Sequence, residues 1–286
     1  MANLYLNKFL SGKKILFLGD SIMGSDRYDG EDEETKGVPD LVSDYTGATV
    51  VNLGVPGSRI VSRSGKDQNE VTGEYVDKNC LDQTEMIKNM ITNDFTNLKK
   101  LVSEKSSKGS QATKAAIIKE QKEERPFKNF SIIILAYGTN DWFNNNFLYD
   151  QKIYNSGKVS LKEGAITILE KNIDTLQKNF PQSKILVLTP IWRYGYTNQV
   201  VWDGDTKNDK GDNYTLKEWA AAIEKKCKEK RVAVLNTYIN VPLSLNNRTY
   251  YFDKNGEDGT HLNYNGNKLY ASIISSKLRE VGEAFN

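Results

Sequence analysis

The sequence predicts an α/β fold in which a parallel β-sheet lies between two layers of helices. Five short apolar runs, each bounded by Gly, Pro or Asn, occur along the chain. Runs of this length are typical of strands that are buried on both faces. Helical patterns separate the runs, and this alternation favours a parallel sheet with helices on both sides. The runs read KKILFLGD, ATVVNLG, SIIILAYG, KILVLTP and VAVLNT.

The clearest helical pattern extends from Leu161 to Phe180. Its apolar residues recur at intervals of three and four, so that they share one face of a helix. They are Ile166, Leu169, Ile173 and Leu176. A second helix is expected from Tyr264 to Leu278, near the C-terminus.

The connection between the second and third runs, from about Gly57 to Phe130, is much longer than a crossover between parallel strands requires. We expect a helical insertion after the second strand, at about residues 61–128, within a single domain covering residues 1–286. A helical stripe and then the segment SEKSSKGSQ predict packed helices joined by a surface loop. The stripe consists of Ile87, Met90, Ile91, Phe95, Leu98, Leu101 and Val102.

The charge balance is close to neutral, with 39 basic and 37 acidic residues and a net charge of +2. Because contact with phosphate backbones needs a concentrated basic surface, we do not expect a nucleic-acid partner. No segment has the apolar length of a membrane span, and the N-terminus lacks an apolar region of signal-peptide length. We expect no membrane association and a cytoplasmic location; an extracellular or phage-associated location and the oligomeric state stay open.

Residues that bind transition metals are scarce, since the chain has two cysteines and one histidine. Cys80 and Cys227 are far apart, which predicts buried free thiols rather than a disulfide or a zinc site. The acidic segments DRYDGEDEE and DGDTKNDKGDN do not match EF-hand spacing and are expected to be solvated loops. We expect neither a metal nor a cofactor.

A serine stands at the end of the first predicted strand, in the sequence GDSI at residues 19–22. The carboxyl edge of an open α/β sheet is where ligands bind. A serine there can expose its hydroxyl and direct its backbone N–H toward a developing oxyanion. Its hydroxyl becomes a good nucleophile only when a base takes the proton. The only histidine is His261, in the sequence DGTH at residues 258–261.

Two further blocks follow predicted strands, NLGVPG at residues 52–57 and GTND at residues 138–141. With these four blocks in this order, the sequence resembles the SGNH/GDSL hydrolase superfamily. Its signature is a GDS serine, a glycine after the second strand, a GxND asparagine and a DxxH pair. The resemblance covers about Lys14 to Ala271 and implies a flavodoxin-like, five-stranded sheet of the SGNH hydrolase fold. Here the first block reads GDSI where the family more often has GDSL.

The resemblance implies a role for each matching residue. Ser21 corresponds to the nucleophile, His261 to the general base and Asp258 to the carboxylate that orients the base. The oxyanion hole would consist of the backbone N–H groups of Ser21 and Gly54 and the side-chain amide of Asn140. The implied enzyme is a serine esterase.

Three aspartates of these blocks have alternative roles. Asp258 could orient His261 or cap the helix that follows, and the orienting role is favoured. Asp20 and Asp141 are expected to hold turns through hydrogen bonds from side chain to backbone.

Aromatic residues follow the third and fourth predicted strands, and Trp142 and Trp192 are the candidates for contact with substrate. The resemblance implies short acyl esters, in particular O-acetyl groups on carbohydrate, so a small-molecule or glycan ester is the expected partner. A carbohydrate-binding or adhesion module of a phage tail or cell surface is the alternative, as is a lipase or thioesterase of the same family. A nucleotide-binding function would need a glycine-rich phosphate loop, which GDSIMGSDR does not provide.

Overall fold

The centre of the protein is a five-stranded parallel sheet with the strand order β11-β8-β5-β1-β2. The computed structural model describes residues 8–24, 36–61, 67–68, 75–76, 82–99, 108–144, 146–155, 158–197, 200–207 and 213–283. Every pairing in the sheet is parallel. The five strands coincide with the five apolar runs and are β1 (Lys14–Gly19), β2 (Thr49–Asn52), β5 (Ile132–Ala136), β8 (Lys184–Leu188) and β11 (Ala233–Leu235).

The chain reverses its direction of travel across the sheet at β1. This strand pairs with β2 on one side and with β5 on the other. Both β1 and β5 are buried along nearly their whole length, as continuously apolar strands require when helices cover both faces. In such a sheet, the crevice at the carboxyl ends of the strands beside the reversal is where ligands bind.

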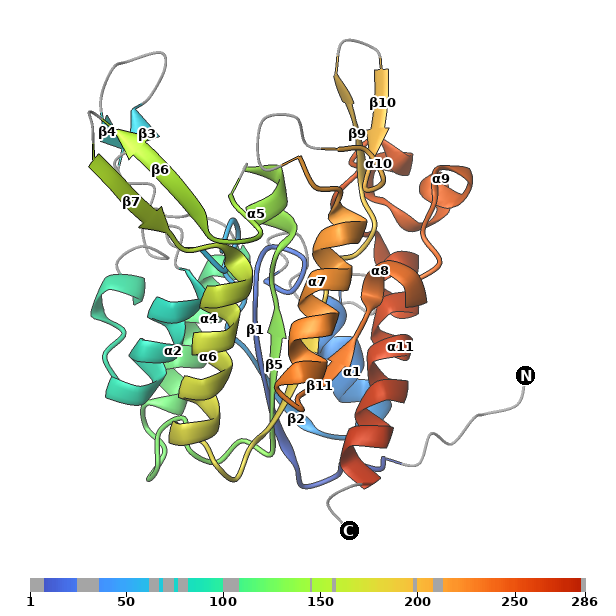
Figure 1. The fold of residues 1–286 in the computed structure, drawn as a ribbon. Helices are drawn as coiled ribbons and strands as arrows, with labels where there is room; N and C mark the ends of the chain where they lie inside the picture. The colour runs from blue at the N-terminus through green and yellow to red at the C-terminus, as the bar shows by residue number, and fades with distance from the viewer. Residues whose placement is uncertain are drawn as a thin grey trace.

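Helices cover both faces of the sheet (Figure 1). On one face, α1 (Val38–Thr46) packs against α11 (Tyr264–Glu283). On the other, α6 (Ala165–Asn179) packs between α2 (Gln83–Thr92) and α7 (Leu216–Glu229). This arrangement confirms the predicted three-layer α/β/α fold.

The predicted helix boundaries need correction at two places. The apolar stripe of α6 is buried as expected, but the helix begins at Ala165 instead of Leu161. Residues 158–162 form a strand, and the following Gly164 lies so close to the backbone of Tyr149 that it has no room for a side chain. At the C-terminus, α11 continues past Leu278 to Glu283.

The insertion after β2 contains α2, α4 (Lys108–Glu120) and a short hairpin of β3 (Asp67–Gln68) and β4 (Tyr75–Val76). Of the predicted helical stripe, Ile91 is partly exposed, and Leu101 and Val102 lie outside the described residues. The remaining stripe residues are buried, namely Ile87, Met90, Phe95 and Leu98.

Two of the predictions on cysteines and acidic loops fall on residues that are not described. Cys227 is a buried free thiol, whereas Cys80 lies outside the described residues. The acidic segment at residues 26–34 also lies outside them, as do residues 208–212 of the second acidic segment. None of the helices in the described residues combines the length and the apolar character that a membrane span requires.

Two further hairpins rise above the carboxyl edge of the sheet, on either side of α5 (Thr139–Phe143), as Figure 1 shows. One consists of β6 (Gln151–Asn155) and β7 (Lys158–Lys162), and the other of β9 (Tyr194–Thr197) and β10 (Val200–Asp203). The remaining short helices lie between β11 and α11, at α8 (Thr237–Asn240), η2 (Leu245–Asn247), α9 (Arg248–Tyr251) and α10 (Asp253–Gly256). The sequence patterns predicted none of these elements.

The loops after β1 and β2 touch through their backbones. A Cβ atom added at Gly24 would lie 2.6 Å from the carbonyl oxygen of Gly54, and one added at Gly54 would lie 2.5 Å from the nitrogen of Gly24. Only residues without a side chain allow this approach. The contact sets the separation between the GDSI block and the block that follows β2.

The substitution Gly24→Ala is therefore expected to lower the free energy of unfolding by about 2–3 kcal/mol, because two backbones must move apart. Urea unfolding of the two proteins measures the difference. The control is Gly12→Ala, which has a φ of 77° but nothing within 4 Å of its added Cβ, and which costs only the backbone strain of about 1 kcal/mol. An equal loss in both variants would mean that the two loops separate at no cost.

Candidate active site

Ser21 lies in a tight turn at the carboxyl end of β1. The N–H groups of Met23 and Gly24 donate to the carbonyl oxygen of Asp20, and the N–H of Ile22 donates to its Oδ1 atom at 3.0 Å. Asp20 thus closes the turn from both its backbone and its side chain, in agreement with the role expected for it. The serine at the centre of this turn is partly exposed.

His261 contacts both of its expected partners. Its Nε2 atom lies 3.0 Å from Oγ of Ser21, a residue 240 positions earlier in the chain. Its Nδ1 atom lies 3.0 Å from Oδ2 and 3.2 Å from Oδ1 of Asp258. When Nδ1 carries the ring proton and donates it to the carboxylate, Nε2 is left as an acceptor for the serine hydroxyl. The three residues therefore form one continuous chain of hydrogen bonds.

Asp258 is held as a carboxylate. Burial raises its pKa, but hydrogen bonds from the His261 ring and from the N–H groups of His261 and Thr260 outweigh burial and hold the pKa well below its usual range. The alternative role of capping α11 belongs to another residue, because Oδ1 of Asn263 accepts the N–H of Gly266 in the first turn of that helix.

Asn140 lies in the first turn of α5, two residues after Gly138, whose φ of 116° favours glycine. One N–H of its side-chain amide donates to the carbonyl oxygen of Ser58 at 3.1 Å. Asn140 therefore borders the loop that follows β2.

The side chain of Asp141 joins α5 to the loop that follows β2. Its buried carboxylate accepts the N–H groups of Ile60 at 2.8 Å and Val61 at 2.9 Å, together with the side chain of Asn146. Burial raises the pKa of Asp141, while these hydrogen bonds act in the opposite direction. The side chain does bind backbone, as predicted, but mainly the backbone of a loop about 80 residues earlier rather than its own turn.

Gly54 does not offer the free N–H that was expected of it. Its N–H donates to Oδ1 of Asn52 at 2.9 Å, while the amide of Asn52 binds the carbonyl oxygen of Met23. The carbonyl oxygen of Gly54 accepts the hydroxyl of Thr113. The glycine is required here for close packing against Gly24, and the prediction that it supplies an oxyanion donor is contradicted.

Gly57, three residues later, lies at the centre of a turn in the same loop. The N–H of Ser58 donates to the carbonyl oxygen of Val55, and Gly57 has a φ of 81°, so residues 55–58 form a type II turn with Pro56 and Gly57 at its centre. Within the described part of the chain, no acceptor faces the Gly57 N–H. The Pro-Gly pair was the signal in the sequence that could have identified this position.

The two tryptophans predicted to contact substrate are buried instead. Trp142 is 5% exposed, packs against Trp202 and donates its Nε1–H to the carbonyl oxygen of Tyr214. Trp192 is 6% exposed and packs against Tyr194 and Phe252. Both rings stabilise the loops above the sheet and have no free face for a substrate, so this prediction is wrong.

Sequence reasoning missed Arg193, which lies beside the DGTH block. Its Nη2 atom donates to Oγ1 of Thr260 at 2.6 Å. Burial lowers the pKa of Arg193 to about 10, against the opposing effect of the Asp20 and Asp258 carboxylates, so that the side chain stays protonated at neutral pH. A single arginine within the aromatic segment IWRYGY was the available signal.

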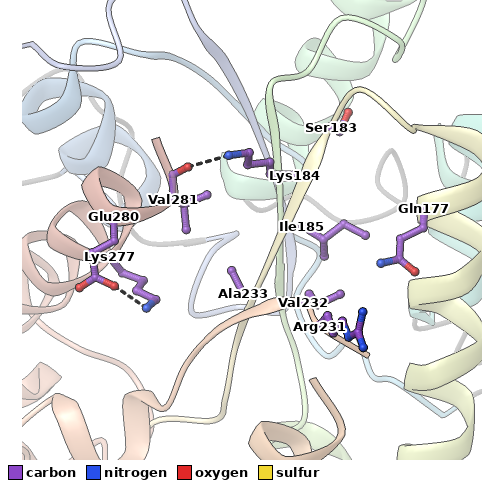
Figure 2. Close-up of a pocket in the computed structure, with 10 residues that line it drawn as sticks. All are labelled: Gln177, Ser183, Lys184, Ile185, Arg231, Val232, Ala233, Lys277, Glu280 and Val281. Carbon is purple, nitrogen blue, oxygen red and sulfur yellow. Dashed lines mark hydrogen bonds and ion pairs between the residues drawn. The ribbon is translucent and has the colours of Figure 1, made fainter. Parts of the chain in front are cut away.

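A cavity of about 530 Å³ lies at the opposite, amino-terminal end of β8 and β11 (Figure 2). None of the predicted site residues lines it. Lys184 donates to the carbonyl oxygen of Val281, and Lys277 pairs with Glu280, so both lysines in its wall are engaged. A second cavity of about 10 Å³ is bordered by Asp20 and Ile22, the two neighbours of Ser21, but Ser21 itself does not line it. Among the described residues, no group of three or more His, Cys, Asp or Glu side chains could hold a metal ion.

This fold, with a serine, a histidine and an aspartate at the carboxyl edge of its sheet, defines a hydrolase of the esterase and lipase kind. The family model described as GDSL-like Lipase/Acylhydrolase matches residues 15–274, which is most of the chain. The protein belongs to this family.

Comparison with solved structures agrees with the fold. A possible lipase from Chitinophaga pinensis is 15% identical, with a TM-score of 0.52 over 94% of this chain and 98% of that one. A carbohydrate acetylesterase from Sinorhizobium meliloti is 13% identical, with a TM-score of 0.49 over 94% of this chain and 99% of that one. The likeness to the first of these two structures concerns the fold alone. The comparison with curated proteins gives no match.

The buried carboxyl of Asp20 makes stability depend on pH. Burial raises its pKa from 3.8 to about 6, and this outweighs the Ile22 hydrogen bond and the charges of His261 and Arg193. Because the folded-state pKa is the higher one, the neutral form stabilises the fold at low pH, and this stabilisation is lost as the pH rises through about 6.

Asp20→Asn keeps an acceptor for Ile22 and removes the charge. We expect it to stabilise the protein above pH 6 by up to about 3 kcal/mol, and to change little below pH 4. Calorimetric melting between pH 4 and 8 measures this. Asp258→Asn is the matched control with the opposite sign, since its lowered pKa predicts a loss of stability at neutral pH. A gain in stability for Asp20→Asn that does not depend on pH would contradict the raised pKa of Asp20.

Proposed function

We propose that the protein is a serine esterase that hydrolyses short acyl esters, with O-acetyl groups on carbohydrate as the substrate class. The observation that carries this proposal is the chain of hydrogen bonds from Ser21 through His261 to Asp258. A serine hydroxyl is a weak nucleophile alone, and an oriented imidazole is what activates it.

In the proposed reaction, Nε2 of His261 takes the proton of Ser21 as Oγ attacks the ester carbonyl carbon. The carbonyl oxygen becomes an oxyanion, and Asp258 stabilises the imidazolium that forms. The bond to the alcohol oxygen then breaks, and the alcohol leaves with the proton from His261. Water repeats the attack on the acyl-serine, which releases the acid and restores the enzyme.

The oxyanion needs donors that are already in place. We assign this role to the backbone N–H groups of Ser21 and Gly57 and to the side chain of Asn140. An amide side chain has two N–H groups, so the bond from Asn140 to Ser58 leaves one of them for the substrate. Gly57 takes the place first given to Gly54, because the Gly54 N–H is bound to Asn52.

The proposed preference for a short acyl group rests on the sequence, which contains no continuous apolar lid of the kind that favours long lipid chains. For the alcohol, Phe143 is 50% exposed and follows Asn140 on α5, where its ring suits stacking on a sugar. The alternative of a binding module without activity has lost the support of Trp142 and Trp192, which are buried.

Replacing Ser21 by Ala is expected to lower kcat for p-nitrophenyl acetate by about four to six orders of magnitude, because no other group takes over the attack. The control Ser276→Ala, at an exposed position of α11, is expected to keep full activity. Labelling with a fluorophosphonate reagent should follow the same pattern. Equal activity in wild type and Ser21→Ala would show that Ser21 is not the nucleophile.

Activity is expected to fall as the acyl chain lengthens. For p-nitrophenyl esters, kcat/KM for a sixteen-carbon acyl group should lie at least about tenfold below that for acetate, equivalent to about 1.4 kcal/mol in the transition state. Steady-state kinetics below the critical micelle concentration of the long ester provide the measurement. Equal or faster turnover of the long ester would favour the lipase alternative.

A further inference from the structure

Arg193, at the end of the connection between β8 and β9, and Tyr194, the first residue of β9, hold the loop that carries Asp258 and His261. The N–H of Tyr194 donates to the carbonyl oxygen of Gly259 at 2.9 Å, and the hydroxyl of Tyr194 donates to the carbonyl oxygen of Gly256. A Cβ atom at Gly259 would overlap the backbone of Tyr194, so the two segments lie in direct contact. The bond from Arg193 to Thr260 adds a side-chain anchor next to His261.

Arg193 is also enclosed by two aromatic rings. The centre of its guanidinium lies 4.6 Å from the ring of Phe143 on α5 and 5.6 Å from that of Trp202 on β10. The side chain is only 6% exposed. A charge shielded from water in this way acts on its neighbours over a longer range than one at the surface.

The charged groups around His261 come from three parts of the chain. Asp258 contacts the ring, Asp20 at the end of β1 acts on it through space, and Asp141 adds its negative charge to the field at Asp20. The tyrosines near Asp20, Tyr137 and Tyr270, are buried, which raises their pKa and keeps their hydroxyls neutral. Arg193 is the cation that interacts with both Asp20 and Asp258.

Several carboxylates around an imidazole favour its protonated form, which cannot accept the serine proton. A buried cation opposes them. We propose that Arg193 is a positioning residue of the proposed esterase, which anchors the loop of His261 through Thr260 and whose charge offsets the charges of Asp20 and Asp258 around the imidazole. This inference rests on the proposed function.

Three variants separate the charge from the hydrogen bond. Arg193→Gln removes the charge and retains a donor for Thr260, Arg193→Lys retains the charge, and Thr260→Val removes the acceptor while keeping size and charge. In Arg193→Gln, the acid limb of the pH profile of kcat/KM is expected to move to higher pH by about 0.5–1 unit. Thr260→Val and Arg193→Lys should leave the acid limb at the pH of the wild type, and they should lower only kcat.

The single histidine of the chain provides a second readout that needs no substrate. In untagged protein, the NMR signals of the imidazole should titrate at higher pH in Arg193→Gln than in wild type. If Arg193→Gln does not fold, Phe143→Ala replaces it, because loss of this half-exposed ring hydrates the guanidinium and should give a smaller shift in the same direction.

An acid limb and imidazole titration that are unchanged in Arg193→Gln, or in Phe143→Ala as its replacement, would overturn the inference. So would equal shifts in Arg193→Gln, Arg193→Lys and Thr260→Val, since charge would then not be the cause. Failure of the proposed function is distinguishable, because it would appear as a wild type without Ser21-dependent hydrolysis while the imidazole titration still reports on Arg193.

Discussion

The hydrogen bond from Ser21 to His261 joins two residues 240 positions apart at a distance of 3.0 Å. It can form only if the end of β1 and the loop before α11 meet at one edge of the sheet. The parallel topology brings them there, because every strand points its carboxyl end in the same direction and the order reverses at β1. The contact between Gly24 and Gly54 and the bonds of Asp141 then fix the neighbouring loops at the spacing that the site needs.

Three aspartates of the signature blocks have three different environments. Asp20 is buried with the N–H of Ile22 as its side-chain partner, and burial raises its pKa to about 6, so the carboxyl holds its proton only below that pH. Asp141 is buried with two backbone donors from another loop, and its carboxylate acts as a tie between loops. Asp258 is less buried and accepts bonds from the ring and backbone of His261, which keep it ionised. Only the last environment suits a carboxylate that orients a base.

The elements above the sheet determine how a substrate could approach. Large aromatic residues pack there against each other, and their burial leaves Phe143 on α5 as a partly exposed ring near Asn140. Arg193 packs against the same ring and donates to Thr260 of the DGTH loop, so α5 and the loop of His261 contact one cation. The cavity at the amino-terminal end of the sheet has no part in this arrangement (Figure 2).

The sequence by itself determined the α/β/α fold, because five continuously apolar runs separated by helical patterns have few other ways to bury their side chains. It also determined the family, since four motifs in order require no knowledge of contacts. Only the tertiary structure decided which of the predicted groups are buried or already hydrogen-bonded and which are accessible to a substrate. Burial of Trp142 and Trp192 depends on neighbours distant in the sequence, and the N–H of Gly54 is occupied because Asn52 turns toward it. The position of Arg193 could not be predicted from the sequence for the same reason. Its partners are Phe143, Trp202 and Thr260, which come from three separate segments that only the folded chain brings together.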